Sequence, residues 1–361
     1  MNEKDTYIKD IRIYQAVSKL SHPIADSTHD ISKIAFYVLE VETKGGVIGQ
    51  GYLLSFHYSP NAIEGALKDM KKFVLEKDYH VYETAQVQKD YEIESEYFGI
   101  VGLQRWALAT LNVAMWDAWA RTMGQPIYRM FGCHRKPIPV YGSGGWISYS
   151  DEELVDEVVN YQKRGFTAVK IKVGSPDMER DIRRLNLVRE ATGPNMKIMM
   201  DANQGMDVPS AIKLISNVEH LGIFWFEEPV VNTDFEGYAT IHAKTKISLA
   251  MGEREYSTVA LRELIGRRAL DLWQPDLGGV EAWRDSAALA NAYNIPVLPH
   301  YYKDYDVPLL CTVANPYGAE SFDWIDAIID NPMVIDNGFA RPREGEGWGF
   351  RFLHEFMTEV K

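Results

Sequence analysis

Two periods of apolar residues divide the first part of the chain. Over residues 8–56, the stretches IRIYQAV and IAFYVLEVET alternate apolar and polar residues, which is the period of half-buried strands. Further on, IEGALKDMKKFVLEK and LQRWALATLNVAMWDAWARTM place apolar residues at helical spacing. The pattern predicts an α+β unit over residues 1–130, with a small antiparallel sheet and a polar loop from His22 to His29.

The glycines of residues 45–51, GGVIGQG, look faintly like a phosphate-binding loop. Such a loop needs a helix directly after it and usually a lysine, and this segment has neither. We therefore interpret it as a β-hairpin.

The pattern of apolar residues changes at Pro137. Short apolar runs recur with helical stretches between them: PIPVYGSGG, AVKIKV, KIMMDAN, FWFEEP, SLAMGE, LDLWQPD, PVLPH and AESFDW. Strands that alternate with helices form parallel βαβ units, and eight runs within about 190 residues fit a closed barrel. We expect residues 131–330 to form this barrel and the Gly-, Pro- and Arg-rich tail, 331–361, to pack back on the N-terminal unit.

Composition and charge narrow the class of protein. The 361 residues are 46% hydrophobic and 25% charged, as in an average globular protein, and the net charge is −13. This charge argues against a general nucleic-acid or anionic-membrane binder, although a local cationic site can still take an acidic substrate. Two cysteines without metal-type spacing, Cys133 and Cys311, indicate reduced thiols. Since neither a signal peptide nor an apolar run of about 18 residues is found, we expect a cytoplasmic protein without a transmembrane helix.

Ionisable residues stand at the ends of the predicted barrel strands. In a parallel barrel these ends meet at one face, where active sites lie. From the third run onward the intervals between them are 26, 26, 23, 24 and 20 residues, so about one charged group arrives with each strand. The polar residues at these ends are Lys170, Lys172, Asp201, Asn203, Glu227, Glu253, Asp276, His300 and Glu320.

Three of these residues are candidate metal ligands. Asp201, Glu227 and Glu253 follow neighbouring strands, and buried carboxylates must be paired or bind a metal. Each one alone is equally compatible with a surface acid. Together they form a hard-oxygen site suited to one Mg²⁺. Glu228 is expected outside this site, because adjacent strand residues face opposite sides.

Lys172 and His300 are the candidate bases. A desolvated lysine can have a lowered pKa and accept a proton, whereas the alternative for Lys170 and Lys172 is simple charge balance with the carboxylates. A lone histidine is more often structural, but Asp276 on the preceding strand can fix its tautomer and raise its basicity. A base on each side of a metal-held carboxylate suits abstraction of the α-proton, with the metal stabilising an enediolate.

The motifs at these strand ends resemble a known family. Lys-x-Lys, Asp-x-Asn, Glu-Glu-Pro, Gly-Glu, Gln-Pro-Asp and Pro-His follow one another in VKIKVG, MMDANQG, WFEEPV, MGERE, QPDLGGV and LPHYY. Their order is similar to that of the mandelate racemase subgroup of the enolase superfamily, in the mandelate racemase/muconate lactonizing enzyme family. The resemblance extends over essentially the whole chain.

The resemblance implies an α/β fold, a (β/α)7β modified TIM barrel with an α+β capping domain. It implies one Mg²⁺ on the three carboxylates. It also implies that Lys172 and His300, the latter oriented by Asp276, are the catalytic acid/base pair. Three further residues would contact the substrate: Lys170 at its carboxylate, Asn203 at the substrate or metal shell, and Glu320 as a hydrogen-bond donor to a carboxylate oxygen.

Within this subgroup, VYGSGGW, KIKVGSPDMERDIRRLNLVREATG and ESFDW look similar to acid-sugar dehydratases of the talarate/galactarate kind. The first hypothesis is therefore a hydro-lyase in carbohydrate catabolism, which removes the C2 proton and the C3 hydroxyl of an aldonate, aldarate or uronate to give a 2-keto-3-deoxy acid. The second is a racemase or epimerase that uses the same two bases. A third is a non-catalytic binding protein that keeps the barrel, and the full set of charged groups argues against it.

Specificity is expected to come from loops of the capping domain, near residues 20–30 and 55–60. His22, His29, His57 and Tyr58 lie there, and each is equally compatible with a surface position. Arg254 and Glu255 receive no role, and the segment after His300, YYKDYDVP, is rich in tyrosine and charge. By analogy with similar barrels, we also expect a homo-oligomer.

Overall fold

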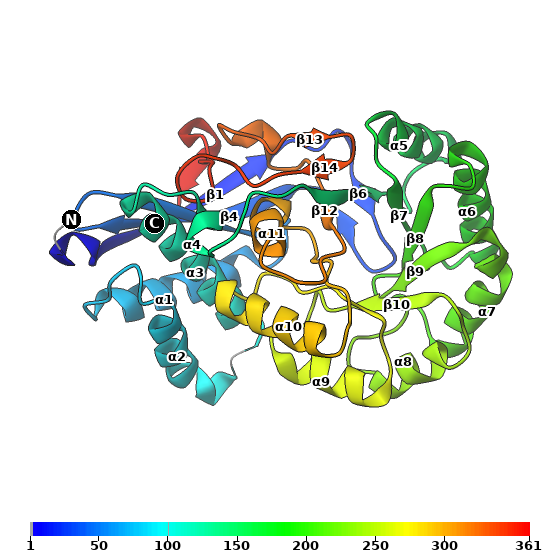
Figure 1. Ribbon diagram of the computed structural model, residues 1–361, viewed down its shortest axis with the longest axis horizontal. Helices are drawn as coiled ribbons and strands as arrows, with labels where there is room; N and C mark the ends of the chain where they lie inside the picture. Colours follow the sequence, from blue (N-terminus) through cyan, green and yellow to red (C-terminus); the bar gives the residue numbers. More distant parts are fainter. Residues whose placement is uncertain (1–2, 100) are drawn as a thin grey trace.

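The computed structural model describes residues 3–99 and 101–361, and it places a barrel beside a cap that holds both ends of the described chain (Figure 1). The cap contains a four-stranded antiparallel sheet in the order β15-β1-β4-β5 and a two-stranded ribbon, β2-β3. Its strands are β1 (Ile8–Ser18), β2 (Ile24–Ala25), β3 (Asp30–Ile31), β4 (Ile34–Thr43), β5 (Ile48–Leu54) and β15 (Met357–Glu359). Its helices are η1 (Glu3–Thr6), α1 (Pro60–Leu75), α2 (Thr84–Glu94), η2 (Glu96–Phe98), α3 (Leu103–Thr122) and α4 (Ile127–Met130), with η5 (His354–Phe356) near the C-terminus.

The hairpin at residues 45–51 has a packing reason for its glycines. Helix α3 lies so close to β5 that a Cβ on Gly49 would stand 2.3 Å from the carbonyl oxygen of Ala114. A Cβ on Gly51 would stand 2.4 Å from the Thr110 carbonyl oxygen. These glycines therefore allow close approach of the helix to the sheet.

The barrel consists of parallel strands that alternate with helices. The sheet runs from β6 to β11, and β12 pairs with β6 to close it. The strands are β6 (Ile138–Gly144), β7 (Ala168–Lys172), β8 (Lys197–Asp201), β9 (Ile223–Glu227), β10 (Ser248–Met251), β11 (Leu272–Trp273) and β12 (Ala319–Ser321). The helices are α5 (Asp151–Lys163), α6 (Met178–Thr192), α7 (Val208–Val218), α8 (Phe235–His242), α9 (Thr258–Arg267), α10 (Val280–Ala292) and α11 (Lys303–Leu310), with η3 (Glu219–Leu221) and η4 (Asp326–Ile328). The helices α5 to α10 cover the outside of the strands (Figure 1), so the predicted (β/α)7β barrel is confirmed.

One predicted strand is reduced to a bridge. In the run PVLPH, only Val297 pairs, with Trp273 on one side and Pro316 on the other. Pro296 and Pro299 flank it, and a proline has no N–H to donate to a ladder. Val297 and Leu298 still donate their N–H groups to the carbonyl oxygens of Asn315 and Trp273, at 3.2 and 3.0 Å, so the barrel stays hydrogen-bonded on both sides directly before His300.

Two further segments differ from the prediction. The region from His22 to His29 is not loop throughout, because Ile24 pairs with Ile31 in the β2-β3 ribbon. The tail pairs with both parts of the molecule. Its strand β15 pairs with β1, whereas the hairpin of β13 (Ile335–Asp336) and β14 (Phe339–Ala340) pairs with β6 of the barrel.

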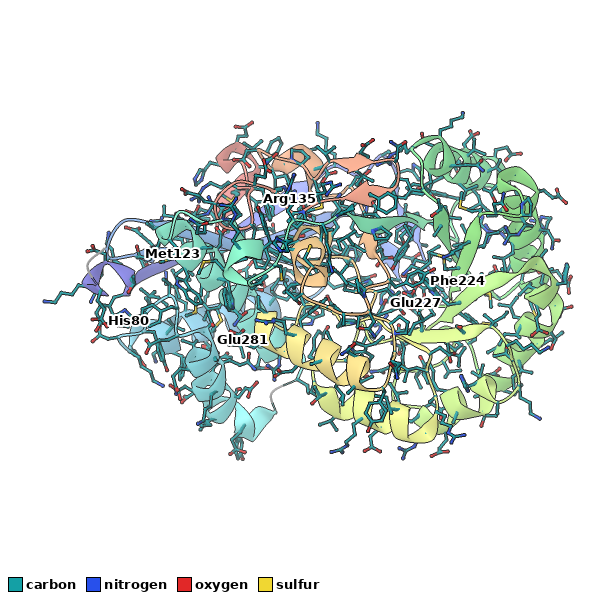
Figure 2. The ribbon with its side chains drawn as sticks, viewed as in Figure 1. His80, Met123, Arg135, Phe224, Glu227 and Glu281 are labelled. Atoms are coloured by element: carbon teal, nitrogen blue, oxygen red, sulfur yellow. The ribbon has the colours of Figure 1, made fainter. Side chains whose placement is uncertain are left out.

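Side chains of the barrel bind the cap firmly. Glu281, on α10 at the boundary in Figure 2, accepts hydrogen bonds from Thr84, Asn112 and Trp116 of the cap helices. The tyrosine-rich segment after His300 has the same function. The hydroxyls of Tyr302 and Tyr305 accept the N–H groups of Leu54 and Tyr52 on the edge strand β5, at 3.1 and 2.9 Å. Among the described residues, none of the helices combines the length and the apolar character needed to cross a membrane.

Candidate active site

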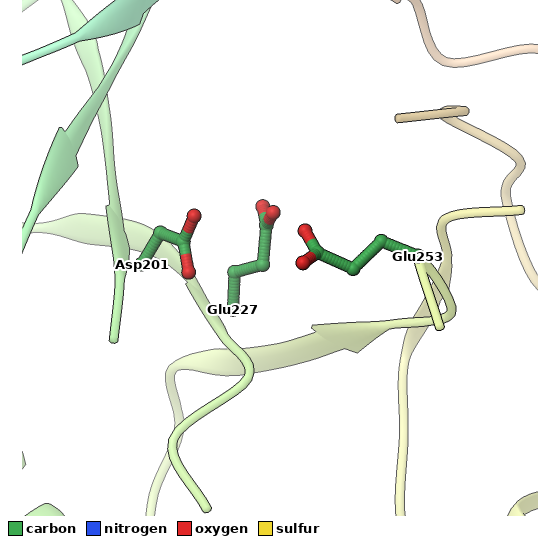
Figure 3. A group of neighbouring side chains, drawn as sticks. All are labelled: Asp201, Glu227 and Glu253. Carbon is green, nitrogen blue, oxygen red and sulfur yellow. The ribbon is translucent and has the colours of Figure 1, made fainter. Parts of the chain in front are cut away.

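The three predicted metal ligands converge at the carboxyl ends of adjacent strands. Asp201 and Glu227 are the last residues of β8 and β9, and Glu253 lies two residues beyond β10. One carboxylate oxygen from each lies within 4.8 Å of the others, and all three side chains are buried. Asp201 and Glu253 approach from opposite sides with Glu227 between them (Figure 3).

This group fits a hard divalent cation. It offers only carboxylate oxygens, which Mg²⁺ prefers, and Oε2 of Glu253 is buried without a hydrogen-bond partner. Burial raises the pKa of Glu227 to about 7, although Lys170 opposes the shift. Burial acts in the same direction on Asp201, but Lys172 and Lys170 outweigh it and lower its pKa to about 2. A cation among these acids would relieve their mutual repulsion.

The two lysines of β7 lie at different depths. Nζ of Lys172 is 2.5 Å from Oδ2 of Asp201, and Lys172 lines a cavity that Glu253 of the triad also lines. Nζ of Lys170 lies 2.5 Å from Oε1 of Glu227 and 2.7 Å from Oε1 of Glu320. Among the described residues that line the cavity, neither Lys170 nor Glu320 is found. Asp201 and Glu227 are likewise not found in that described lining, so Lys170 and Glu320 balance charge beside the triad, away from the cavity.

Charge interactions keep both ammonium groups protonated here. Burial disfavours the charged form of Lys172, but the Asp201 carboxylate outweighs it, so the pKa of Lys172 is raised. The same competition, with Glu227 and Glu320 as the partners, raises the pKa of Lys170. Burial likewise opposes ionisation of Glu320, yet Lys170 lowers the pKa of that carboxyl to about 2. Glu320 is thus ionised, whereas the predicted donor role would require its acid form.

His300 stands at the opposite end of the triad from Lys172. Its Nε2 lies 3.5 Å from Oε2 of Glu253, and its Nδ1 lies 3.9 Å from Oδ2 of Asp276. The second distance is that of an ion pair rather than a hydrogen bond. Burial disfavours the imidazolium, but Glu253 and then Asp276 outweigh it and raise the pKa of His300 to about 10. The histidine is therefore a proton donor in this arrangement.

Several residues that support the triad escaped the sequence analysis. Gln274 and Trp225 donate hydrogen bonds to Oε2 of Glu227, at 2.6 and 3.2 Å. Both lie in the predicted strands, so a search for polar groups at every strand end would have found Gln274.

Asn203 donates its backbone N–H to Oδ1 of Asp201 at 2.8 Å, and its side-chain oxygen is buried without a partner beside the cavity.

Arg254 and Glu228 now have structural partners. The guanidinium of Arg254 lies 3.3 Å from Oε2 of Glu228 and 3.4 Å from Oε1 of Glu253. Gln204 donates to both oxygens of Glu228, at 2.9 and 3.0 Å. Asn232 connects this network to Glu255, to which it donates at 2.7 Å. Glu228 therefore lies outside the triad and steadies Arg254, which in turn steadies one of the triad carboxylates.

A turn of the cap closes over the site. The hydroxyls of Ser27 and Thr28 donate to the carbonyl oxygens of Ala202 and Asn203, which directly follow Asp201. The same turn brings Asp26 and His29 to the cavity wall, together with Tyr58 from the loop after β5. The cavity has a volume of about 360 Å³, and both cap and barrel residues line it. His22 and His57 are not among the described lining residues.

A barrel that carries three strand-end carboxylates between a lysine and a histidine, under a cap, defines a class of metal-dependent enzymes. Residues 8–132 match the mandelate racemase/muconate lactonizing enzyme N-terminal domain, and residues 153–356 match the enolase C-terminal domain-like family. The chain belongs to this family, as its motifs predict.

Curated relatives span nearly the whole chain. An L-talarate/galactarate dehydratase of Salmonella typhimurium is 26% identical over 94% of this chain and 87% of the relative. An arabinonate dehydratase of Saccharolobus solfataricus is 27% identical over 98% and 99%. A D-galactarolactone cycloisomerase of Agrobacterium fabrum is 29% identical over 97% and 98%.

Solved structures agree with the fold. An enolase from an alpha proteobacterium, bal199, with bound magnesium has a TM-score of 0.90 at 27% identity, over 97% of this chain and 98% of that one. A racemase from Streptomyces coelicolor reaches a TM-score of 0.92 at 24% identity, over 97% and 100%. At that identity the second comparison supports the fold alone.

Proposed function

We propose that this protein is a Mg²⁺-dependent dehydratase of a sugar acid. It removes the proton at C2, next to the carboxylate, and the hydroxyl at C3, and the resulting enol becomes a 2-keto-3-deoxy acid. The observation that carries the proposal is the placement of Lys172 and His300. They lie at opposite ends of the acidic triad, next to Asp201 and Glu253 respectively, and both line one cavity.

Asp201, Glu227 and Glu253 are the proposed ligands of one Mg²⁺. Their oxygen donors, their burial and their spacing support this role, and magnesium is bound in the similar structure from bal199. Bound Mg²⁺ supplies positive charge that stabilises the substrate carboxylate as its α-proton leaves, and it offsets the carboxylates that raise the pKa of Lys172 and His300.

The chain's own residues move the protons. Lys172, once neutral, takes the C2 proton, and the imidazolium of His300 gives a proton to the departing C3 oxygen, so that water leaves. With the opposite C2 configuration, neutral His300 takes the C2 proton instead and then gives it to the departing C3 oxygen, so that water again leaves. Asp276 positions His300, since its Oδ2 lies 3.9 Å from Nδ1 of the ring.

The relatives support elimination as the reaction. Two of the enzymes similar to this chain over at least 94% of its length are named dehydratases of acid sugars. Asn203 is proposed as a substrate contact, because its unpartnered side-chain oxygen lies beside the cavity. Lys170 stays a proposed contact of the substrate carboxylate, and Glu320 stays a proposed hydrogen-bond donor to it, a role that requires protonation of the Glu320 carboxyl. Self-association and a cytoplasmic location remain predictions from the sequence.

The second candidate is a racemase or epimerase. Two groups on either side of one carbon can exchange its proton between faces without losing the hydroxyl, and the Lys172–His300 pair provides both. The observation that favours this alternative is therefore the same pair, and only the fate of the C3 hydroxyl separates the two reactions.

Proton NMR in D₂O distinguishes these reactions. The protein with Mg²⁺ is incubated with a panel of aldonates, aldarates and uronates, and the C2 and C3 signals are followed. Loss of both signals with formation of a 2-keto-3-deoxy acid is the expected result. Deuterium at C2 without elimination would instead identify the epimerase, and no reaction with any acid sugar would refute the substrate class.

A further inference from the structure

One wall of the cavity is aromatic. It is built by side chains from the barrel and the cap, namely Phe56, Trp146, Tyr301, Phe322 and Trp324. Phe322 stacks on Trp324 with ring centroids 4.3 Å apart, and Trp146 stacks on Trp324 at 5.9 Å. Phe56 meets the Trp324 ring edge-on at 5.6 Å. The faces of such rings take the C–H-rich side of a ligand and present no charge.

This wall lies beside the reacting groups. Nζ of Lys172 is 5.3 Å from the centroid of the Trp146 ring. Tyr301, which follows His300 directly, lies 5.8 Å from Phe322 between ring centroids. An acid whose C2 lies between Lys172 and His300 therefore has the aromatic wall next to its carbon chain.

The cationic groups of the cavity are already paired. Each described positive or basic side chain of the lining has a carboxylate partner within 3.5 Å: Lys172 with Asp201, His29 with Asp26, Arg254 with Glu228 and Glu253, and His300 with Glu253. A carboxylate at the far end of a substrate would therefore have to share one of these cations with a protein carboxylate that already pairs with it.

The cap adds a negative charge instead. Asp26 lines the cavity, and its Oδ1 accepts the N–H groups of Thr28 and His29, both at 2.8 Å. Burial raises the pKa of Asp26, but His29 and Lys172 outweigh it, so the carboxyl stays ionised. A second substrate carboxylate that lies beside this turn would face the Asp26 carboxylate, which His29 pairs at 3.0 Å, and would compete with it for that histidine.

The geometry points to a monocarboxylic sugar acid as the substrate, with one face against the Trp146–Phe322–Trp324 wall, and to discrimination against dicarboxylic sugar acids by Asp26. This inference rests on the proposed function, of which it narrows the substrate class. Asp26 and Trp324 are its specificity-determining residues.

A matched pair of ligands tests it. A hexonate and the hexarate of the same configuration at C2 to C5 differ only at C6, where the first has a hydroxyl and the second a carboxylate. Their affinities are measured by calorimetry on the full chain with Mg²⁺, in a His300→Asn background so that turnover does not consume the ligand. The hexonate is expected to bind at least tenfold more tightly, which corresponds to about 1.4 kcal/mol. Equal affinity, tighter hexarate binding, or no binding of either acid would overturn the inference.

Two variants assign the discrimination to residues. Asp26→Asn removes the charge but keeps an oxygen for the N–H groups of Thr28 and His29, so the ratio of hexonate to hexarate affinity should fall severalfold. An unchanged ratio would overturn the role of Asp26. Trp324→Leu should weaken hexonate binding about tenfold and Trp324→Phe should restore most of it. Equal binding by both variants would overturn the role of the aromatic wall.

The two proposals can fail separately. If the hexonate binds selectively but NMR shows neither elimination nor C2 exchange in the wild-type protein, the dehydratase proposal fails and the substrate class stands. If a hexarate is dehydrated faster than the matched hexonate, the dehydratase stands and the substrate class fails.

Discussion

Replacing Lys170 by methionine tests the charge balance beside the triad. The ammonium lies 2.5 Å from Glu227, 2.7 Å from Glu320 and 3.7 Å from Asp201, and all four side chains are buried. Methionine has a similar length without the charge, so the variant leaves buried carboxylates unpaired. Breaking a buried ion pair by removing one partner costs about 3–5 kcal/mol. At about 2 °C per kcal/mol for a chain of this length, the midpoint of thermal unfolding should fall by about 6–10 °C.

The stability lost in the Lys170→Met variant should depend on pH in a defined direction. With Lys170 present, the pKa of Glu227 is about 7 and that of Glu320 about 2, and loss of the ammonium raises both. A carboxyl whose pKa is higher in the folded than in the unfolded state destabilises the fold as pH rises through that range. The variant should therefore lose more stability at pH 8 than at pH 5, where protonation relieves the charge.

The assay is thermal and urea unfolding of metal-free protein, followed by circular dichroism at both pH values. The double variant Lys170→Met/Glu320→Gln also removes one of these carboxylates, so its unfolding midpoint should recover part of the decrease. Lys9→Met is the matched control, because it removes a lysine 2.6 Å from Glu42 at an exposed position and should cost less than about 1 kcal/mol. A Lys170→Met midpoint within 2 °C of wild type at pH 8 would refute the reasoning.

The remaining predictions concern the acid, the metal and a buried carboxyl outside the triad. His300→Asn should lower kcat for dehydration by roughly 10³-fold with Mg²⁺ affinity retained, measured by NMR and calorimetry, and substantial turnover would exclude its role as the acid. Glu253→Gln should weaken Mg²⁺ binding by roughly 100-fold and abolish the rise in unfolding temperature that Mg²⁺ gives the wild type, and an unchanged affinity would exclude it as a ligand. Glu157 accepts the N–H of Gly145, and burial raises its pKa to about 7. As pH rises from 4.5 to 7, the free energy of unfolding of Glu157→Gln should therefore gain roughly 3 kcal/mol relative to that of the wild type. Parallel pH profiles of the two proteins in urea unfolding would contradict this.

Period and spacing along the chain predicted most of the fold. The alternation at residues 34–43 appears as β4, the helical spacing at 103–123 as α3, and the strand-end acids as the triad. The run around Val297 failed as a strand because two prolines remove the donors that a ladder needs, although its apolar character is that of a buried strand. The apolar pattern of a segment indicates that it is buried, whereas strand pairing also requires backbone N–H groups that can donate hydrogen bonds.

The sequence by itself determined the parallel barrel and which groups reach its rim, because one strand–helix unit is about 25 residues long and delivers one residue per strand end. Only the tertiary structure decided how those groups pair. It placed Lys172 beside the cavity and Lys170 away from it, although both lie on the same face of one strand, because Lys170 pairs with Glu227 of β9 and Glu320 of β12 whereas Lys172 pairs with Asp201. It also brought Asp26 and the wall around Trp324 to the substrate cavity, since contacts between the cap and the barrel join residues more than a hundred positions apart, and no local period encodes them.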